Sequence, residues 1–89
     1  MNSNGNWQLG VDSSVYAVLT RFPRKDARRV SEVIESLAMN PYAGDVKKLG
    51  GKDNLWRRRV GAYRIFYEIS TTRRRVDVSE VDRRGSKTY

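Results

Sequence analysis

The 89-residue chain is long enough for one domain and too short for a second core or a deep cofactor cleft. Its 18 Lys and Arg against 10 Asp and Glu give a net charge of +8, and the absence of cysteine and histidine excludes disulfide scaffolds, thiol nucleophiles, Cys-ligated zinc and a histidine base. The sequence has no apolar run near the ~20 residues of a membrane span and no recognisable signal peptide. We therefore expect a cytoplasmic protein that does not bind membranes. Residues 1–89 should form a single domain, with a flexible start over 1–6.

The first half of the chain predicts a strand followed by two helices. An apolar stretch over 7–11 indicates the strand. Asp12, Ser13 and Ser14 can each cap the helix that follows, whose apolar residues recur at i, i+3, i+4 and i+7 from Val15 to Phe22. Proline at position 23 interrupts it, and a second helix is predicted from about 24 to 38. The two helices form a hairpin with one apolar seam.

The second half of the chain changes to strand periodicity. A glycine-containing loop leads into three predicted strands, over 55–60, 63–70 and about 75–83. Gly61-Ala62 suits a two-residue hairpin turn with glycine first, so Arg59 faces Arg64 and Arg57 faces Phe66. The predicted fold class is therefore α+β, with an N-terminal strand and a helical hairpin packed on a small antiparallel sheet in the order β-α-α-β-β-β.

Side chains alternate between the two faces of a strand, and this alternation sorts the predicted sheet. One face is apolar and should meet the helices; it holds Trp56, Val60, Tyr63, Ile65, Tyr67 and Ile69. Arg58 also falls on that face, where it either reaches out at the sheet margin or pairs with a helix carboxylate. The opposite face holds Arg57, Arg59, Arg64 and Phe66. Unless a bulge intervenes in the last strand, Arg83 joins them, because Val76 and Val78 take the core side.

The charge is concentrated where these strands lie. Residues 1–46 carry five basic and five acidic side chains, whereas residues 47–89 carry thirteen and five. Thirteen of the 18 basic residues are arginine, which suits bidentate contact with phosphate. The chain has no histidine or cysteine, and its ten carboxylates, the remaining candidate metal ligands, are scattered. Arginine, lysine and tyrosine remain, and they suit one reaction in particular, transesterification of RNA by its own 2′-hydroxyl. There the nucleophile belongs to the substrate, and the protein orients it and neutralises charge on phosphorus.

Three segments carry a family resemblance. Lys48-Leu49-Gly50-Gly51 and the block over 55–69, LWRRRVGAYRIFYEI, resemble the signature of the RelE/ParE toxin superfamily. The ending over 81–89, VDRRGSKTY, is similar to the C-terminus of its RelE branch. The predicted element order agrees, so the resemblance covers nearly the whole chain.

The resemblance implies a toxin of a toxin–antitoxin pair: a ribosome-dependent endoribonuclease that cleaves mRNA in the A site and inhibits translation, without metal or other cofactor. Its partners would be mRNA on the ribosome, 16S rRNA of the small subunit and an acidic antitoxin. The implied catalytic residues are Arg57, Arg59, Arg64, Arg83 and Tyr89, with Arg84 as the alternative to Arg83. The residues expected to bind RNA or the ribosome are Lys47, Lys48, Lys52, Phe66 and Arg84.

Several alternatives remain open at the level of sequence. A ParE-like toxin that inhibits DNA gyrase without catalysis would share the fold, and an inactive RNA-binding module would share the charge. Arginine does not act as a general base, so Tyr89 or Lys52 would take that role. Phe66 either stacks on a base or lies under the C-terminal segment.

Overall fold

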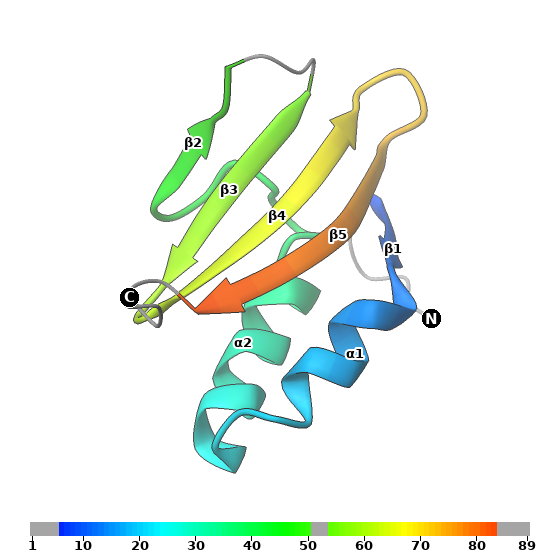
Figure 1. Cartoon of the computed structure of the whole chain (residues 1–89). Helices are drawn as coiled ribbons and strands as arrows, with labels where there is room; N and C mark the ends of the chain where they lie inside the picture. Colours follow the sequence, from blue (N-terminus) through cyan, green and yellow to red (C-terminus); the bar gives the residue numbers. More distant parts are fainter. Residues whose placement is uncertain (1–5, 51–53, 84–89) are drawn as a thin grey trace.

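The computed structural model describes residues 6–50 and 54–83. Within them the chain forms two helices and five strands (Figure 1). In chain order they are β1 (Gln8–Val11), α1 (Ser13–Leu19), α2 (Arg24–Ser36), β2 (Val46–Lys48), β3 (Leu55–Val60), β4 (Tyr63–Ser70) and β5 (Arg75–Arg83). The three strands predicted in the second half agree with the structure residue for residue.

The strands form one sheet in the order β1-β5-β4-β3-β2, in which β1 runs parallel to β5 and the other pairs are antiparallel. The α+β class is confirmed, but the sheet is mixed rather than antiparallel, because the first strand inserts beside the last. The short edge strand β2, which lies in the stretch expected to be a loop, was not predicted.

Both helices lie against one face of the sheet and enclose the core (Figure 1). Asp12 caps α1, accepting a hydrogen bond from the backbone N–H of Ser14 at 3.0 Å. The apolar seam of the helices meets the apolar face of β3, β4 and β5. The fully buried side chains include Val30, Leu37, Ile65 and Tyr67. No helix in the described part of the chain is long and apolar enough to cross a membrane.

The β3–β4 hairpin has the predicted register, with Arg59 opposite Arg64 and Arg57 opposite Phe66. Gly61 takes a φ of 58° in the turn, a conformation in which glycine has no steric cost. The predicted division of faces follows from this register. Tyr63 and Tyr67 are buried on the helix side, and Trp56 is partly buried against the core.

A β-bulge interrupts β5. Tyr67 pairs with Val78 whereas Phe66 pairs with Glu80, so Ser79 is an extra residue without a partner. The bulge reverses the alternation beyond it: Val81 is buried, and Asp82 takes the face opposite the helices. Arg83 is consequently opposite Tyr63, on the helix side. The placement of Arg83 with the other arginines was conditional on the absence of a bulge, and it is wrong.

Candidate functional site

The sheet face that points away from the helices, here called the open face, brings together three of the predicted arginines. Arg57 and Arg59 project from β3, and Arg64 projects from β4 directly opposite Arg59. Like charges directly across a ladder destabilise a sheet. The open face therefore concentrates positive charge at a cost that folding alone does not explain.

Arg57 is the most enclosed of the three. It is only 9% exposed, between its ladder neighbours Phe66 and Lys47. Its Nη2 lies 3.9 Å from Oδ1 of Asp45, too far for a hydrogen bond. Within the described residues, its buried Nε has no hydrogen-bond acceptor. A buried charged donor without an acceptor is costly, and an anionic oxygen would satisfy it.

Arg64 has a different environment, because the bulge in β5 places Asp82 beside it. Nε and Nη2 of Arg64 donate to the two carboxylate oxygens of Asp82, both at 2.9 Å. These hydrogen bonds raise the pKa of Arg64 above its ordinary value. The guanidinium lies 5.7 Å from the centre of the Phe66 ring. Arg64 is thus held in a fixed direction over the open face and keeps N–H groups that Asp82 does not use.

Of the remaining predicted residues in the described part of the chain, Lys47 lies beside the three arginines, and Arg83 and Lys48 lie on the helix side. Arg83 is exposed, with its guanidinium 5.9 Å from the ring centre of Tyr63. Lys47 is exposed on the open face beside Arg57, whereas Lys48 is opposite Trp56 and belongs to the helix side. The predicted residues Lys52, Arg84 and Tyr89 lie outside the described residues.

Neither buried tyrosine can act as a base. The Tyr67 hydroxyl donates to the carbonyl of Pro41 at 2.8 Å, and burial raises its pKa to about 12. Burial and a 2.8 Å hydrogen bond to Asp26 likewise raise the pKa of Tyr63. Both side chains remain protonated at neutral pH. This agrees with the prediction that they are core aromatic residues.

Arg58 has a structural role. Its Nη1 donates to the carbonyl of Ala43 at 2.8 Å, and its guanidinium packs against Gly44, so closely that a Cβ there would collide with it. Of the two alternatives given by the sequence, the first is confirmed: the Arg58 side chain reaches out at the sheet margin. Its hydrogen bond goes to a backbone carbonyl and not to a helix carboxylate. It fixes the loop that leads into β2.

Sequence reasoning missed two acidic residues beside the site, Asp45 and Asp82. Asp45 precedes a strand that has no clear periodicity. Asp82 has the wrong parity for the open face unless the bulge is known. The sequence does hold one sign of the bulge. Val76 and Val78 are two residues apart, as alternation requires, but Val81 follows after three residues. If Val81 is also buried, a residue between them must be extra, and Asp82 then falls on the open face.

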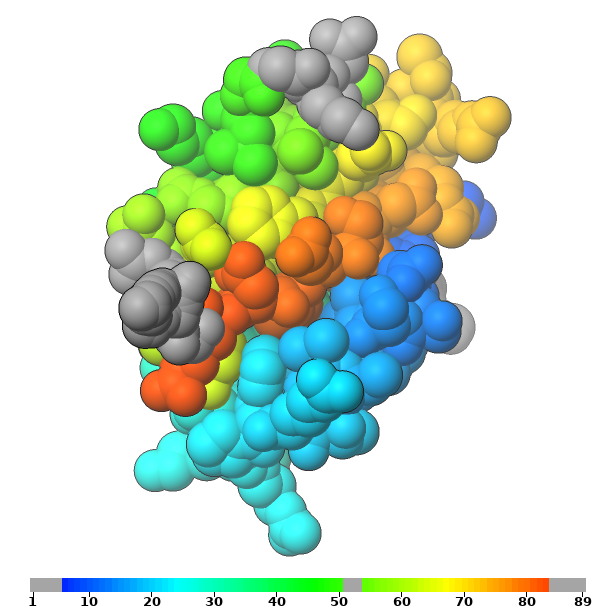
Figure 2. All heavy atoms as spheres, viewed as in Figure 1, coloured from blue at the N-terminus to red at the C-terminus, as the bar shows by residue number. Residues whose placement is uncertain are grey.

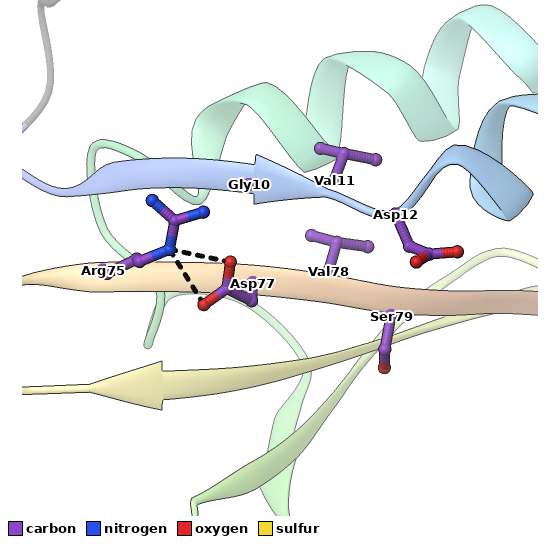
Figure 3. Close-up of a pocket in the computed structure, with 7 residues that line it drawn as sticks. All are labelled: Gly10, Val11, Asp12, Arg75, Asp77, Val78 and Ser79. Atoms are coloured by element: carbon purple, nitrogen blue, oxygen red, sulfur yellow. Dashed lines mark hydrogen bonds and ion pairs between the residues drawn. The ribbon is translucent and has the colours of Figure 1, made fainter.

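A separate hollow of about 280 Å³ opens at the seam between β1 and β5 (Figure 3). The Arg75–Asp77 ion pair lies beside Gly10 there, and a Cβ at Gly10 would collide with it. The hollow is lined by Gly10, Val11, Asp12, Arg75, Asp77, Val78 and Ser79. It contains none of the predicted site residues. Across residues 6–50 and 54–83, no group of three acidic side chains is placed to hold a metal ion.

The sequence of this chain is similar to that of a known protein family. Residues 17–87 match the family model described as the ParE toxin of type II toxin–antitoxin systems, parDE. A candidate RelE1 toxin of Methanocaldococcus jannaschii is 30% identical over 81 residues, which is 88% of this chain and 90% of that protein.

Solved structures show the same fold. The archaeal RelE–RelB complex from Pyrococcus horikoshii OT3 matches with a TM-score of 0.78 at 25% identity, over 92% of this chain and 99% of that one. The RelB–RelE antitoxin–toxin complex from Methanococcus jannaschii matches with a TM-score of 0.63 at 27% identity, over 86% and 92%. The isolated Escherichia coli RelE toxin, at 17% identity and a TM-score of 0.70 over 91% and 87%, shares the fold.

Proposed function

This chain belongs to the RelE/ParE superfamily of toxins from toxin–antitoxin systems, and on that premise we propose that it is a ribosome-dependent endoribonuclease that cleaves mRNA. The observation that carries the proposal is the buried guanidinium of Arg57, whose Nε has no acceptor among the described residues. Arg59 and Arg64 flank it on the same face. Three guanidinium groups on one face of a sheet suit a phosphodiester.

The proposed reaction is attack of a ribose 2′-hydroxyl on the adjacent phosphorus. The P–O5′ bond breaks, leaving a 2′,3′-cyclic phosphate and a 5′-hydroxyl. A base removes the proton of the 2′-hydroxyl, and the departing 5′-oxygen gains a proton. The arginines stabilise the charge that develops on the phosphate oxygens. Phe66 offers a ring on which a base can stack.

Proton transfer falls to residues beyond the arginines. Arginine stays protonated, and Tyr63 and Tyr67 have raised pKa values. We therefore assign the base to Tyr89 or Lys52. Arg83 lies on the helix side of the sheet. Of the two alternatives for the last catalytic arginine, we therefore propose Arg84 rather than Arg83.

The test is primer extension on mRNA from a translating extract given this protein. We expect discrete cuts within codons, and a loss of roughly 100- to 1,000-fold in cleavage rate with Arg57→Gln. Tyr89→Phe and Arg84→Ala should also weaken cleavage, and Arg83→Ala should weaken it less than Arg84→Ala. Arg73→Ala, at an exposed turn, is the matched control. Intact mRNA with the wild-type protein would overturn the proposal.

A second candidate is a ParE-like inhibitor of DNA gyrase, which the matching family model favours. It predicts intact mRNA, halted growth and broken or overwound DNA. The open face distinguishes the two candidates, since a gyrase inhibitor has no need of the Arg57 site. Intact mRNA and healthy cells would instead indicate an inactive RNA-binding module.

We also propose that the partner of this chain is an acidic antitoxin. Related toxins were solved in complex with RelB, and the net charge of +8 favours an acidic partner. Co-expression with the small product of an adjacent gene should yield a stable complex and restore growth. The absence of any such adjacent gene would count against both toxin functions.

A further inference from the structure

A second basic surface lies at the tip of the helical hairpin. All five basic residues of the first half of the chain fall within 21–29, in the α1–α2 turn and the first turns of α2, and all five are exposed. They are Arg21, Arg24, Lys25, Arg28 and Arg29, here called the helix-tip patch. The one acidic residue among them, Asp26, is part-buried and accepts the hydrogen bond of Tyr63. The exposed charge of this segment is therefore entirely positive.

Folding alone does not favour this arrangement. Positive charge at a helix N-terminus opposes the helix dipole, which prefers cations in the last turn. Arg24 with Arg28, and Lys25 with Arg29, are like-charged pairs at i,i+4, which repel. Within residues 6–50 and 54–83, no carboxylate lies within 4.0 Å of any of the five cations. The helix-tip patch is thus unneutralised in the described part of the chain.

The helix-tip patch is continuous with the open face. A Cβ at Gly61, in the β3–β4 turn, would lie 3.6 Å from Nη1 of Arg29. Arg59 and Arg64 face each other in the two strands that this turn joins, one ladder position further along. Figure 2 shows the tip of the hairpin, in cyan, beside the end of β5. Positive charge therefore extends from α2 past the turn to the candidate site.

The chemistry of the helix-tip patch identifies the kind of partner. Protein interfaces have an apolar centre, but the apolar Phe22 and Ala27 of this segment pack inward against the core. Four of the five cations are arginines, which bind phosphate with two parallel hydrogen bonds. A row of exposed guanidinium groups without apolar surface suits a chain of phosphates.

We propose that the helix-tip patch binds the phosphate backbone of RNA at a site distinct from the reacting phosphodiester. It would anchor the protein on structured RNA and leave the open face to the scissile strand. The choice of RNA over other polyphosphates rests on the proposed function, whereas phosphate binding at the patch does not.

The experiment measures binding of the full-length protein to a fluorescent RNA hairpin by anisotropy over a salt series. The double variant Arg24→Gln/Arg28→Gln is compared with Arg73→Gln/Arg74→Gln, which removes the same charge from the exposed β4–β5 turn. We expect the first variant to bind several-fold more weakly. Its salt slope should fall by roughly 1.8, because each phosphate that is no longer neutralised lowers the slope by about 0.9. The turn variant should change little. The melting temperature of the first variant should be unchanged or higher, because repulsion in α2 is relieved.

Three comparisons decide the result. Equal losses in both variants would show a general effect of net charge and overturn the proposal. If Arg24→Gln/Arg28→Gln weakens binding to a DNA duplex of the same sequence by the same factor, the patch binds phosphate without a preference for RNA. That result would refute the assignment to RNA. Loss of binding to an acidic peptide with RNA binding unchanged would assign the patch to a protein partner instead. Cleavage in the extract is scored separately, so failure of the proposed nuclease does not alter the binding result.

Discussion

Replacing Asp82 with alanine tests how the basic face is held together. In the native protein, Asp82 accepts two hydrogen bonds from Arg64 at 2.9 Å. Arg64 also faces Arg59 across the β3–β4 ladder. Removing the carboxylate deletes the ion pair and leaves the two arginines opposed without that counter-charge. We therefore expect Asp82→Ala to lower the stability of the fold.

The magnitude follows from exposure and geometry. The Arg64 and Asp82 side chains are 37% and 34% exposed, so the pair contributes in the range of surface ion pairs, about 0.2–1 kcal/mol. Exposing the like-charge pair adds a cost of about 0.2–1 kcal/mol. A total near ~1 kcal/mol lowers the melting temperature of a domain this small by about 4–8 °C.

The assay is thermal unfolding followed by circular dichroism, with Asp77→Ala as the matched control. Asp77 also pairs with an arginine, Arg75, at 2.9 Å, but its cross-strand neighbour is Glu68. Its removal relieves repulsion while it breaks an ion pair, so the control should change little. In about 1 M salt, where the screening length is ~3 Å, the difference between the variants should shrink. Equal destabilisation by both variants, or a difference that ignores salt, would refute the reasoning.

Three further predictions concern the core and the loops. Tyr67→Phe leaves the carbonyl of Pro41 without its hydrogen bond, which should cost about 1–3 kcal/mol in urea denaturation. Because the pKa of Tyr67 is raised to about 12 from its ordinary ~10, the neutral phenol stabilises the fold below pH ~10. That contribution should disappear as pH rises through about 12, and Tyr67→Phe should abolish this part of an alkaline titration of stability. Gly44→Ala should destabilise by at least ~1 kcal/mol in thermal melts, because φ is +89° and the Cβ would collide with Arg58. Gly50→Ala, whose Cβ would meet no atom of residues 6–50 and 54–83, should be neutral.

Local patterns in the sequence predict much of this fold. The glycine of the β3–β4 turn sets the register, and the register assigns Arg57, Arg59 and Arg64 to one face. The same reasoning places Tyr63 and Tyr67 in the core. These features depend on residues close together in the chain, where turn geometry and side-chain alternation act directly.

Other features depend on distant or irregular contacts. The parallel pairing of β1 with β5 joins residues far apart in sequence, and no local pattern specifies it. Strand β2 has three residues, two of them lysines, which are typical of an edge strand but too few to show alternation. The bulge at Ser79 is set by packing, because burial of Val81 requires it. The acidic partner of Arg64 was missed for that reason.

The bulge at Ser79 also determines where β5 tolerates changes in length. Deleting Ser79 would restore a regular ladder and leave Val81, Asp82 and Arg83 on their present faces, since Phe66 already pairs with Glu80. Deleting a residue after the bulge would instead exchange the faces of everything that follows. An alignment of this chain with a relative that lacks the bulge should therefore place its gap at Ser79. A gap placed later would shift the residues between Ser79 and the gap by one position, and so assign each of them to the wrong side of the sheet.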